Sequence, residues 1–310
     1  MGPRHTLLAV VIAAIWGFNF VVIEVGLDSL PPLLFAALRF AVAAFPAVLL
    51  VRRPAVPWRW FALIGVPLGV GQFGLLFIGM HLGMPAGLSS LVVQTQALFT
   101  IMFAGLLLRE RLRPLQLFGM LVAFGGVALV GADFGRGGPA LAFLACVTGA
   151  AMWGLANVGM RRMNQTAARP PDALAFMVWM SLTPPLPLLA LSLIFEGPRA
   201  GLAALRDISL AGVGALAFNA YVATLVAFGL WGWLMRRYDA GIVAMYSLLV
   251  PPFGIASAAL VLDEPVTALQ VLAAVLIIGG VAIGGLRRTP AAPESGLVRH
   301  VDVAAPHSTR

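Results

Sequence analysis

The stretch Gly87–Arg113 reads GLSSLVVQTQALFTIMFAGLLLRERLR, and it has an echo later in the chain. The echo, Gly241–Thr267, reads GIVAMYSLLVPPFGIASAALVLDEPVT. A shift of 154 residues aligns the two stretches and places Glu110 on Glu264. The same shift continues beyond them and superposes two later Gly-Gly pairs.

A second pair of matching segments begins nearer the N-terminus. Residues 13–21 read AAIWGFNFV and residues 150–158 read AAMWGLANV, which align at a shift of 137 residues. Because separated matches recur in the same order, we expect an internal duplication of one structural unit, with a longer connection in the second copy.

The composition is that of a protein dissolved in lipid. Of the 310 residues, 61% are hydrophobic and 10% are charged, with a mean hydropathy of +0.97. A soluble domain carries about 25% charged residues. The net charge of +8 comes from arginines that stand between apolar runs and form no basic face, so a nucleic-acid partner is not expected.

A membrane-spanning helix needs about 20 mostly apolar residues. The sequence therefore predicts an all-α integral membrane protein with ten transmembrane helices in two five-helix repeats. The helices are expected at residues 7–27, 33–51, 60–81, 86–108, 114–132, 138–159, 173–195, 208–234, 240–262 and 266–286. The repeats are expected at 1–135 and 136–286, followed by a disordered cytoplasmic tail at 287–310.

Arginine is unevenly distributed between the connections, which predicts orientation by the positive-inside rule. The N-terminus and every second connection hold Arg4, Arg52, Arg53, Arg59, Arg109, Arg111, Arg113, Arg161, Arg162, Arg169, Arg236, Arg237, Arg287 and Arg288. The intervening connections hold only Arg136, Arg199 and Arg206. Both termini should be cytoplasmic, and because five is odd, the repeats should run in opposite directions. Inverted repeats around a midplane site are a recurring plan of secondary transporters.

Several segments carry a family resemblance. They are WGFNFVVIEVGL, PPLLFAALRF, GMPAGLSSLVVQTQALFTIM, RERL, LLVP and IASAALVLDE. Together they resemble the EamA branch of the drug/metabolite transporter superfamily, and most of all its bacterial exporters of cysteine and O-acetylserine. The resemblance implies ten helices, a place in the bacterial inner membrane and efflux of small amino-acid metabolites. The chain departs from that pattern at Glu24, where a basic residue is expected, and at His81, where a neutral amide is expected.

Amides inside the predicted helices are candidates for lining a substrate cavity. Polar groups are costly in hydrocarbon, so they face either a cavity or another helix. Gln94 and Gln96 are about 200° apart on one helix, so only one should line a central cavity. Gln72 and Asn219 occupy corresponding helices of the two repeats and have the same two interpretations.

Trp16 and Trp153 lie in mid-helix at repeat-related positions, each followed by glycine. They are interpreted either as packed helix crossings or as symmetric cavity walls, with Asn19 and Asn157 beside them.

Charged residues inside the spans are rare. Arg39 lies roughly 9 Å inside the second span, and Glu24 lies about one turn inside the first. Either residue could extend to the interface, or Arg39 could pair with Glu24 or attract a substrate carboxylate. Glu24 is the candidate for coupling to protons. Glu264, beside a proline, is interpreted as an acid at the start of the last helix.

Pro251 and Pro252 lie halfway along the ninth span. Neither has an N–H, so the carbonyls of Ser247 and Leu248 lose their helical partners. We expect a kink there that turns Tyr246, Ser247 and the freed carbonyls toward the cavity. The corresponding positions of the fourth span lack proline, so the break is expected in the second repeat alone.

Other classes of protein receive little support. The sequence has no H-E-x-x-H pair and, having no lysine, no phosphate-binding G-x-x-x-x-G-K-[ST] loop. We therefore expect no metal, no cofactor and no enzymatic activity, with a small-molecule substrate and the lipid bilayer as partners. The remaining alternatives are a drug, sugar or nucleotide-sugar transporter, an intramembrane enzyme and a structural membrane protein. GxxxG at Gly65–Gly69 and Gly280–Gly284 allows close packing within the protomer or in a homodimer.

Overall fold

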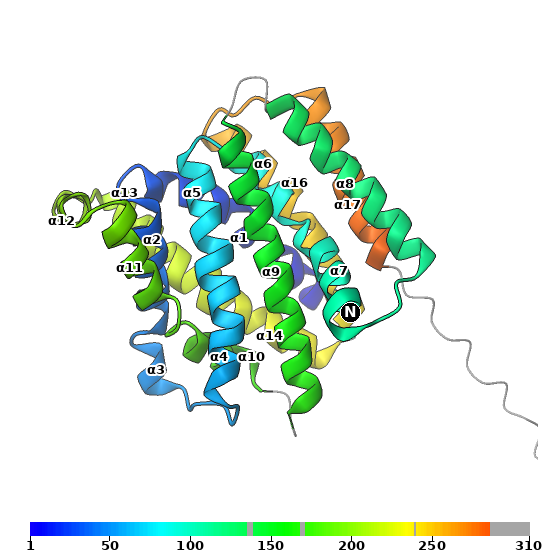
Figure 1. Cartoon of the computed structure of the whole chain (residues 1–310), viewed down its shortest axis with the longest axis horizontal. Coiled ribbons are helices and arrows are strands. Elements are labelled where there is room, and N and C mark those ends of the chain that lie inside the picture. The colour runs from blue at the N-terminus through cyan, green and yellow to red at the C-terminus, as the bar shows by residue number, and fades with distance from the viewer. Residues whose placement is uncertain (135–138, 168–170, 239, 286–310) are drawn as a thin grey trace, which may run out of the picture.

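The computed structural model describes residues 1–134, 139–167, 171–238 and 240–285, and within these ranges the regular structure is entirely helical (Figure 1). The predicted tail at 287–310 lies outside the described residues, as do Arg136, Arg169, Arg287 and Arg288.

Ten helical segments of the described chain are long and apolar enough to cross a membrane, which confirms the predicted fold class. The first five spans are α1 (Pro3–Leu27), α2 with α3 (Pro32–Ala44 and Ala47–Leu50), α4 with η1 and α5 (Trp58–Gly65, Val66–Gly74 and Leu75–His81), α6 with α7 (Ala86–Val93 and Gln96–Leu108), and α8 (Pro114–Phe134).

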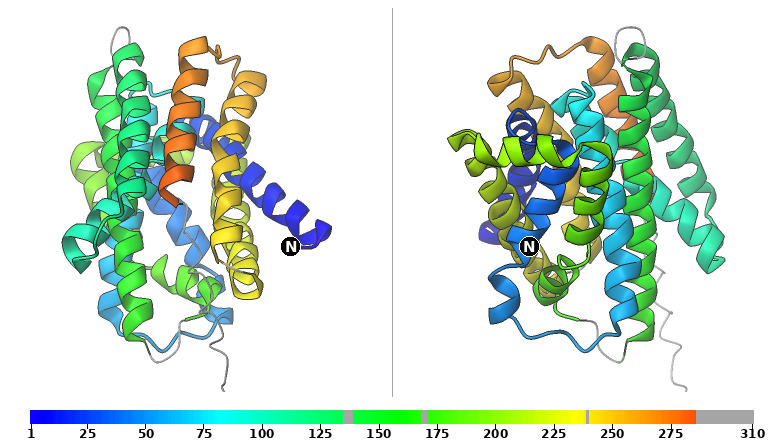
Figure 2. Two further views of the ribbon diagram at one scale, coloured as in Figure 1. Left: turned by 90° about the vertical axis from the view of Figure 1, so that its right-hand side faces the viewer. Right: turned by 60° about the vertical axis from the view of Figure 1, so that its left-hand side comes forward.

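The second five spans follow the same plan. They are α9 (Ala140–Thr166), α10 with α11 (Ala173–Met180 and Pro185–Phe195), α13 with η2 and α14 (Leu210–Ala217, Phe218–Val226 and Ala227–Arg237), α15 with η3 and α16 (Ala240–Met245, Tyr246–Leu249 and Val250–Val261), and α17 (Ala268–Gly285). The short helix α12 (Pro198–Arg206) connects α11 to α13. Figure 2 shows α1 and the connection after α16 from two further sides.

The irregular parts of the spans recur in both repeats. The third span of each repeat contains a nine-residue π-helical segment, η1 or η2. The fourth span is also interrupted in both, by the 3₁₀ segment η3 in the second repeat and by a turn at Gln94 and Thr95 in the first. The expectation of a break in the second repeat alone is therefore wrong.

The break in the first repeat forms without proline. The Thr95 hydroxyl donates to the carbonyl of Val92 over 2.6 Å, and such a bond within a turn bends helices in membranes. The backbone N–H of Leu98 then bonds to the carbonyl of Thr95, three residues back. A threonine and two prolines thus interrupt equivalent spans by different chemistry.

The first helix of each repeat crosses the fourth span of the other. A Cβ added to Gly17 would lie 2.6 Å from the Cβ of Phe253, and one added to Gly154 would lie 2.6 Å from the Cβ of Phe99. The shift of 137 relates the two glycines and the shift of 154 relates the two phenylalanines. These contacts favour the packing interpretation of the Trp-Gly pairs, because the glycines admit the opposing backbone.

Both GxxxG motifs are used within the protomer. Gly280 lies against Gly119 and Ala123 of α8, so that α8 and α17 form a close pair at one side of the molecule (Figure 1). Gly65 packs against Thr183, in the connection between α10 and α11. The homodimer remains a prediction.

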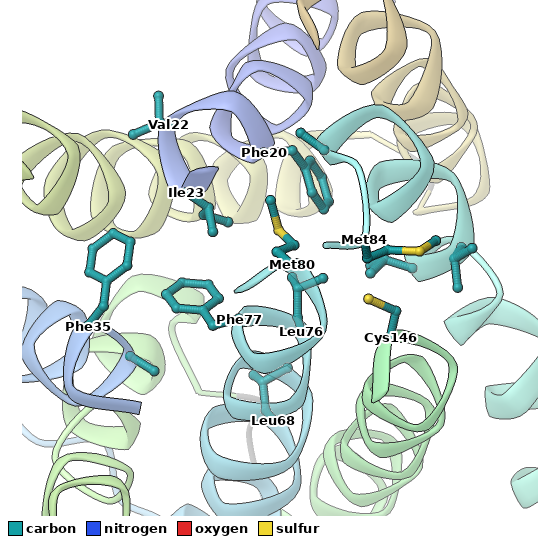
Figure 3. Packing of buried hydrophobic residues seen from close by; sticks show 14 of the residues in the cluster. Phe20, Val22, Ile23, Phe35, Leu68, Leu76, Phe77, Met80, Met84 and Cys146 are labelled. Atoms are coloured by element: carbon teal, nitrogen blue, oxygen red, sulfur yellow. The ribbon is translucent and has the colours of Figure 1, made fainter. Parts of the chain in front are cut away.

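The core lies where α1, α2, α5 and α9 converge. Figure 3 shows Phe20 and Ile23 of α1 facing Phe77 and Met80 of α5, with Cys146 of α9 beside them. Cys146 is a free, buried thiol.

Candidate functional site

Arg39 of α2 is the most deeply buried charged side chain of the described residues, with 2% of its surface exposed. Its Nη2 donates to the hydroxyl of Thr224 in η2 over 2.8 Å. Its guanidinium carbon lies 3.7 Å from the ring centre of Phe73 and 4.9 Å from that of Phe40. Arg39 therefore does not extend to the membrane surface, and aromatic faces replace part of its hydration.

Arg39 has no acidic partner. The ion pairs found among the described residues are Arg161–Glu110 and Arg236–Asp172, so pairing of Arg39 with Glu24 is not observed. The Nε and Nη1 atoms of Arg39 are buried and donate no hydrogen bond within the described chain. A buried charge with free donors is costly in a membrane protein, which marks this position as a site for a further group.

Three amides with unpartnered atoms lie on the helices that surround Arg39. Asn19, Gln72 and Asn219 are buried, on α1, η1 and η2. The side-chain oxygens of all three lack a hydrogen-bond partner, as does the amide nitrogen of Asn219. These oxygens are acceptors, while the free groups of Arg39 are donors. The helices that pack around α2 therefore carry unpartnered buried acceptors as well as the unpartnered donors of Arg39.

The π-helical segment η2 connects Arg39 to this set. Thr224 accepts the hydrogen bond from Arg39 and donates its own proton to the carbonyl of Asn219 over 2.8 Å. A π-helix bonds residues five apart, and such segments are frequent at functional sites. The side chain and the carbonyl are five residues apart here, so the wider turn itself holds Thr224 in place.

Trp16 of α1 contacts the same segment, η2. Its indole N–H donates to the carbonyl of Ala223 in η2 over 3.0 Å, and its ring packs on Phe228 and Trp231. Trp153, its counterpart in the second repeat, is half-buried against the core. Trp16 and Trp153 thus both belong to packed crossings, and Trp16 also contacts η2 beside Thr224.

The other predicted residues form two separate polar contacts. Asn157 of α9 donates to Gln96 over 2.6 Å and to Thr100 over 3.1 Å. Gln94 donates to the carbonyl of Ser247 over 2.9 Å. Both glutamines therefore make the interhelical hydrogen bonds that were one of their two interpretations.

The bond between Gln94 and Ser247 joins the two helix breaks. Ser247 lies in η3, four residues before Pro251, so its carbonyl lacks the α-helical donor that residue 251 would supply. It accepts the N–H of Val250, three residues along, as well as the amide of Gln94. Tyr246 packs beside this point against the cluster that contains Ile12 and Val243.

Glu24 lies apart from Arg39. It follows Gly17 by seven residues, which is about two helical turns, so it shares the side of α1 that faces α16. Its Oε2 is buried and has no hydrogen-bond partner.

Sequence reasoning missed two residues of these contacts and assigned the wrong role to a third, Glu264. Thr224 and Phe73 give no signal in sequence, since a threonine and a phenylalanine are ordinary in an apolar span. Glu264 does not start the last helix, which begins at Ala268; it accepts hydrogen bonds from the backbone of Ala86 and Gly87. The sequence did carry one signal for this contact. The proline before Ala86 has no side-chain acceptor to cap a helix, so the first N–H groups of that helix need an acceptor from elsewhere.

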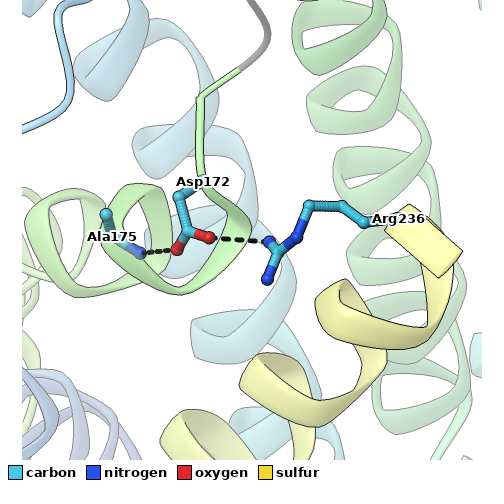
Figure 4. A network of polar contacts seen from close by, with 3 residues as sticks. All are labelled: Asp172, Ala175 and Arg236. Carbon is cyan, nitrogen blue, oxygen red and sulfur yellow. Dashed lines mark hydrogen bonds and ion pairs between the residues drawn. The ribbon is translucent and has the colours of Figure 1, made fainter.

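The exposed ion pairs lie at the ends of helices. Figure 4 shows Asp172 accepting from the backbone of Ala175 over 2.9 Å and from Arg236 over 2.6 Å. Both charged side chains are about half exposed, and exposed pairs contribute little to stability. Among the described residues, no group of three His, Cys, Asp or Glu side chains could hold a metal ion.

The architecture is that of a ten-helix membrane transporter with a polar site between repeats. The chain matches the EamA-like transporter family over residues 4–132 and 140–284. This protein belongs to the EamA-like transporter family.

Named relatives are similar along most of the chain. A "probable amino-acid metabolite efflux pump" of Escherichia coli K12 is 41% identical over 291 residues, which are 93% of this chain and 97% of that protein. A protein of Salmonella typhimurium with the same description is 41% identical over 286 residues, covering 91% and 95% of the two chains. A solved crystal structure shares the fold with a TM-score of 0.61 and 22% identity, covering 90% of this chain and 95% of the other.

Proposed function

We propose that this protein exports small amino-acid metabolites of the cysteine and O-acetylserine type from the bacterial cytoplasm, and that Arg39 binds the substrate carboxylate. The observation that carries the proposal is the buried guanidinium with free Nε and Nη1 atoms. A carboxylate is the group that best satisfies such donors.

The neutral amides suit the other end of the same molecule. An amino acid at neutral pH carries an ammonium group next to its carboxylate. The free oxygens of Asn19, Gln72 and Asn219 are acceptors for that ammonium. An anion without an ammonium group would leave these oxygens without a donor, and on this ground the site suits a small zwitterion. The description of the two relatives as amino-acid metabolite efflux pumps agrees with this chemistry.

Orientation follows from the distribution of arginine. We place both termini and the connections around Arg52, Arg109 and Arg161, called here the arginine-rich face, in the cytoplasm. The opposite, arginine-poor face carries the connections at 28–31, 82–85, 196–209 and 263–267 and lies outside the inner membrane. Substrate then enters from the arginine-rich face and leaves through the arginine-poor face.

Efflux from reconstituted vesicles tests the proposal. Vesicles loaded with labelled cysteine, O-acetylserine or other amino acids should release them faster with this protein than with its Arg39→Gln variant. If the vesicles release a drug or sugar but none of the amino acids, the alternative substrate class is correct. A pH gradient should accelerate release, and Glu24→Gln should remove that acceleration while downhill release remains.

A further inference from the structure

In the first repeat, α2 and α6 begin on the arginine-poor face without a side-chain cap of their own. α2 and α6 follow Pro31 and Pro85, and neither proline makes a side-chain hydrogen bond to its helix. The first N–H groups of a helix have no partner inside that helix and need acceptors from elsewhere. This need is acute near a membrane, where water is scarce.

Carboxylates of the second repeat supply the acceptors. Glu196 accepts from the backbone of Leu33 over 2.6 Å and of Leu34 over 3.1 Å. Glu264 accepts from Ala86 over 2.7 Å and from Gly87 over 3.0 Å. Each glutamate therefore uses both carboxylate oxygens, one for each of two successive amides.

The two caps lie in similar surroundings on the arginine-poor face. Glu196 directly follows α11 and is further held by the hydroxyl of Ser192 over 2.6 Å. Glu264 follows α16, in the connection to α17. Ser29 and Ser209 add a third contact between the repeats there, with their hydroxyl oxygens 2.7 Å apart.

On the opposite face the repeats are joined by the indole N–H of Trp179, which donates to the carbonyl of Val51 over 2.9 Å, and by an exposed ion pair. Glu110, which corresponds to Glu264 at the shift of 154, pairs with Arg161. Their side chains are 35% and 46% exposed, so water competes with this pair. The caps on the arginine-poor face instead combine a negative charge with the positive end of a helix dipole.

We propose that Glu196 and Glu264 form the outer gate of the transporter. Each carboxylate holds one first-repeat helix against the second repeat, and it releases that helix when the repeats separate on the outer side. Rocking of one repeat against the other is how inverted-repeat transporters alternate access. α2 carries Arg39 and α6 leads to Gln94, so the capped helices are also those that reach the polar contacts inside. The direction of the gate rests on the proposed function.

Distance measurements between spin labels test the gate without any substrate. In a Cys146→Ala background, labels at His81→Cys and Ala203→Cys report the separation of the repeats on the arginine-poor face, where both residues are exposed. Labels at Ala55→Cys and Gln165→Cys report the other face. Glu196→Gln with Glu264→Gln should raise the population with long separations at the first pair, on the order of ten-fold for each lost cap.

Matched control variants separate gating from a general change of charge. Asp28→Asn and Asp207→Asn also remove acids from exposed positions of the arginine-poor face, and they should leave both distance distributions unchanged. A folded Glu196→Gln/Glu264→Gln protein with unchanged separations at the first pair would overturn the gate. Longer separations without any efflux of amino acids would preserve the gate and remove the proposed function.

A second measurement keeps both glutamates, in case the variants fold poorly. Ser29→Cys with Ser209→Cys, in the Cys146→Ala background, should form a disulfide on oxidation that holds the outer side closed. Amide hydrogen exchange at Leu33, Leu34, Ala86 and Gly87 should then be slower in the oxidised than in the reduced protein. Equal exchange in the two forms would show that these caps do not open and would overturn the gate.

Discussion

Arg39 donates a hydrogen bond to Thr224 over 2.8 Å, and this bond joins the second span of the first repeat to the third span of the second. It uses one nitrogen of the guanidinium and leaves Nε and Nη1 free. Arg39 can therefore keep its contact with the protein while it binds a carboxylate. Lysine has a single nitrogen and cannot divide these tasks in the same geometry.

Arg39→Lys should raise the substrate KM of transport by about 10- to 100-fold, the equivalent of one charged hydrogen bond of about 1.5–3 kcal/mol. The concentration dependence of efflux from vesicles measures this change. Arg52→Lys, at an exposed position of the arginine-rich face, is the control and should leave KM unchanged. An unchanged KM in Arg39→Lys would show that a point charge is sufficient.

The repeated glycine crossing gives a prediction about stability. Gly17→Ala places a Cβ 2.6 Å from that of Phe253 and 2.8 Å from the carbonyl oxygen of Val250. Gly154→Ala meets Phe99 in the same way. We expect each variant to lose about 1–3 kcal/mol of stability from overpacking, measured as a lower midpoint of thermal unfolding in detergent.

Gly279→Ala is the control for these variants. Its added Cβ would have no heavy atom within 4 Å, so the unfolding midpoint should not fall. Unchanged midpoints for Gly17→Ala and Gly154→Ala would mean that the crossing helices move apart at little cost.

The ten spans were predictable because a run of about twenty apolar residues forms a membrane-spanning helix in lipid. The largest error in their ends is at α9, which continues through Arg161 and Arg162 to Thr166. Hydropathy ends the predicted span at the first charges, but arginine and glutamine are good helix formers. The helix therefore extends beyond the apolar run.

The arrangement of the polar site was less predictable. The sequence identified Arg39 and Asn219 as unusual but gave no sign that Thr224 connects them. That connection depends on the π-helical turn of η2, and no residue pattern in the span predicts a π-helical turn. Gln94 and Gln96 were likewise identified, yet their partners Ser247 and Asn157 come from helices whose contacts only the fold determines.

The predicted orientation has its own test. Single cysteines at Asp28 and Ala203 should react with a membrane-impermeant thiol reagent added outside intact cells, in a Cys146→Ala background. Cysteines at Ala55 and Ala167 should react only after the membrane is opened. Equal outside labelling of both groups would contradict the assignment of the arginine-rich face to the cytoplasm.

The final prediction concerns Pro251 and Pro252, which follow η3 at the start of α16. Replacing both with alanine restores two N–H groups, and these can bond to the carbonyls of Ser247 and Leu248 four residues earlier. We expect α16 to extend backward through η3, so that the N–H of residue 251 replaces that of Val250 at the Ser247 carbonyl and competes there with Gln94. Efflux should fall while the protein still inserts into the membrane.

A double-mutant cycle tests this competition. If the prolines act by keeping the Ser247 carbonyl available, Gln94→Leu should lower efflux strongly in the native chain. It should add little in the Pro251→Ala/Pro252→Ala background, where the bond is already weakened. Efflux and unfolding midpoints of the native chain, both parents and the combined variant supply the cycle. Fully additive losses of efflux would mean that the prolines and Gln94 act separately, and normal efflux in the proline variant would remove the helix break from the mechanism.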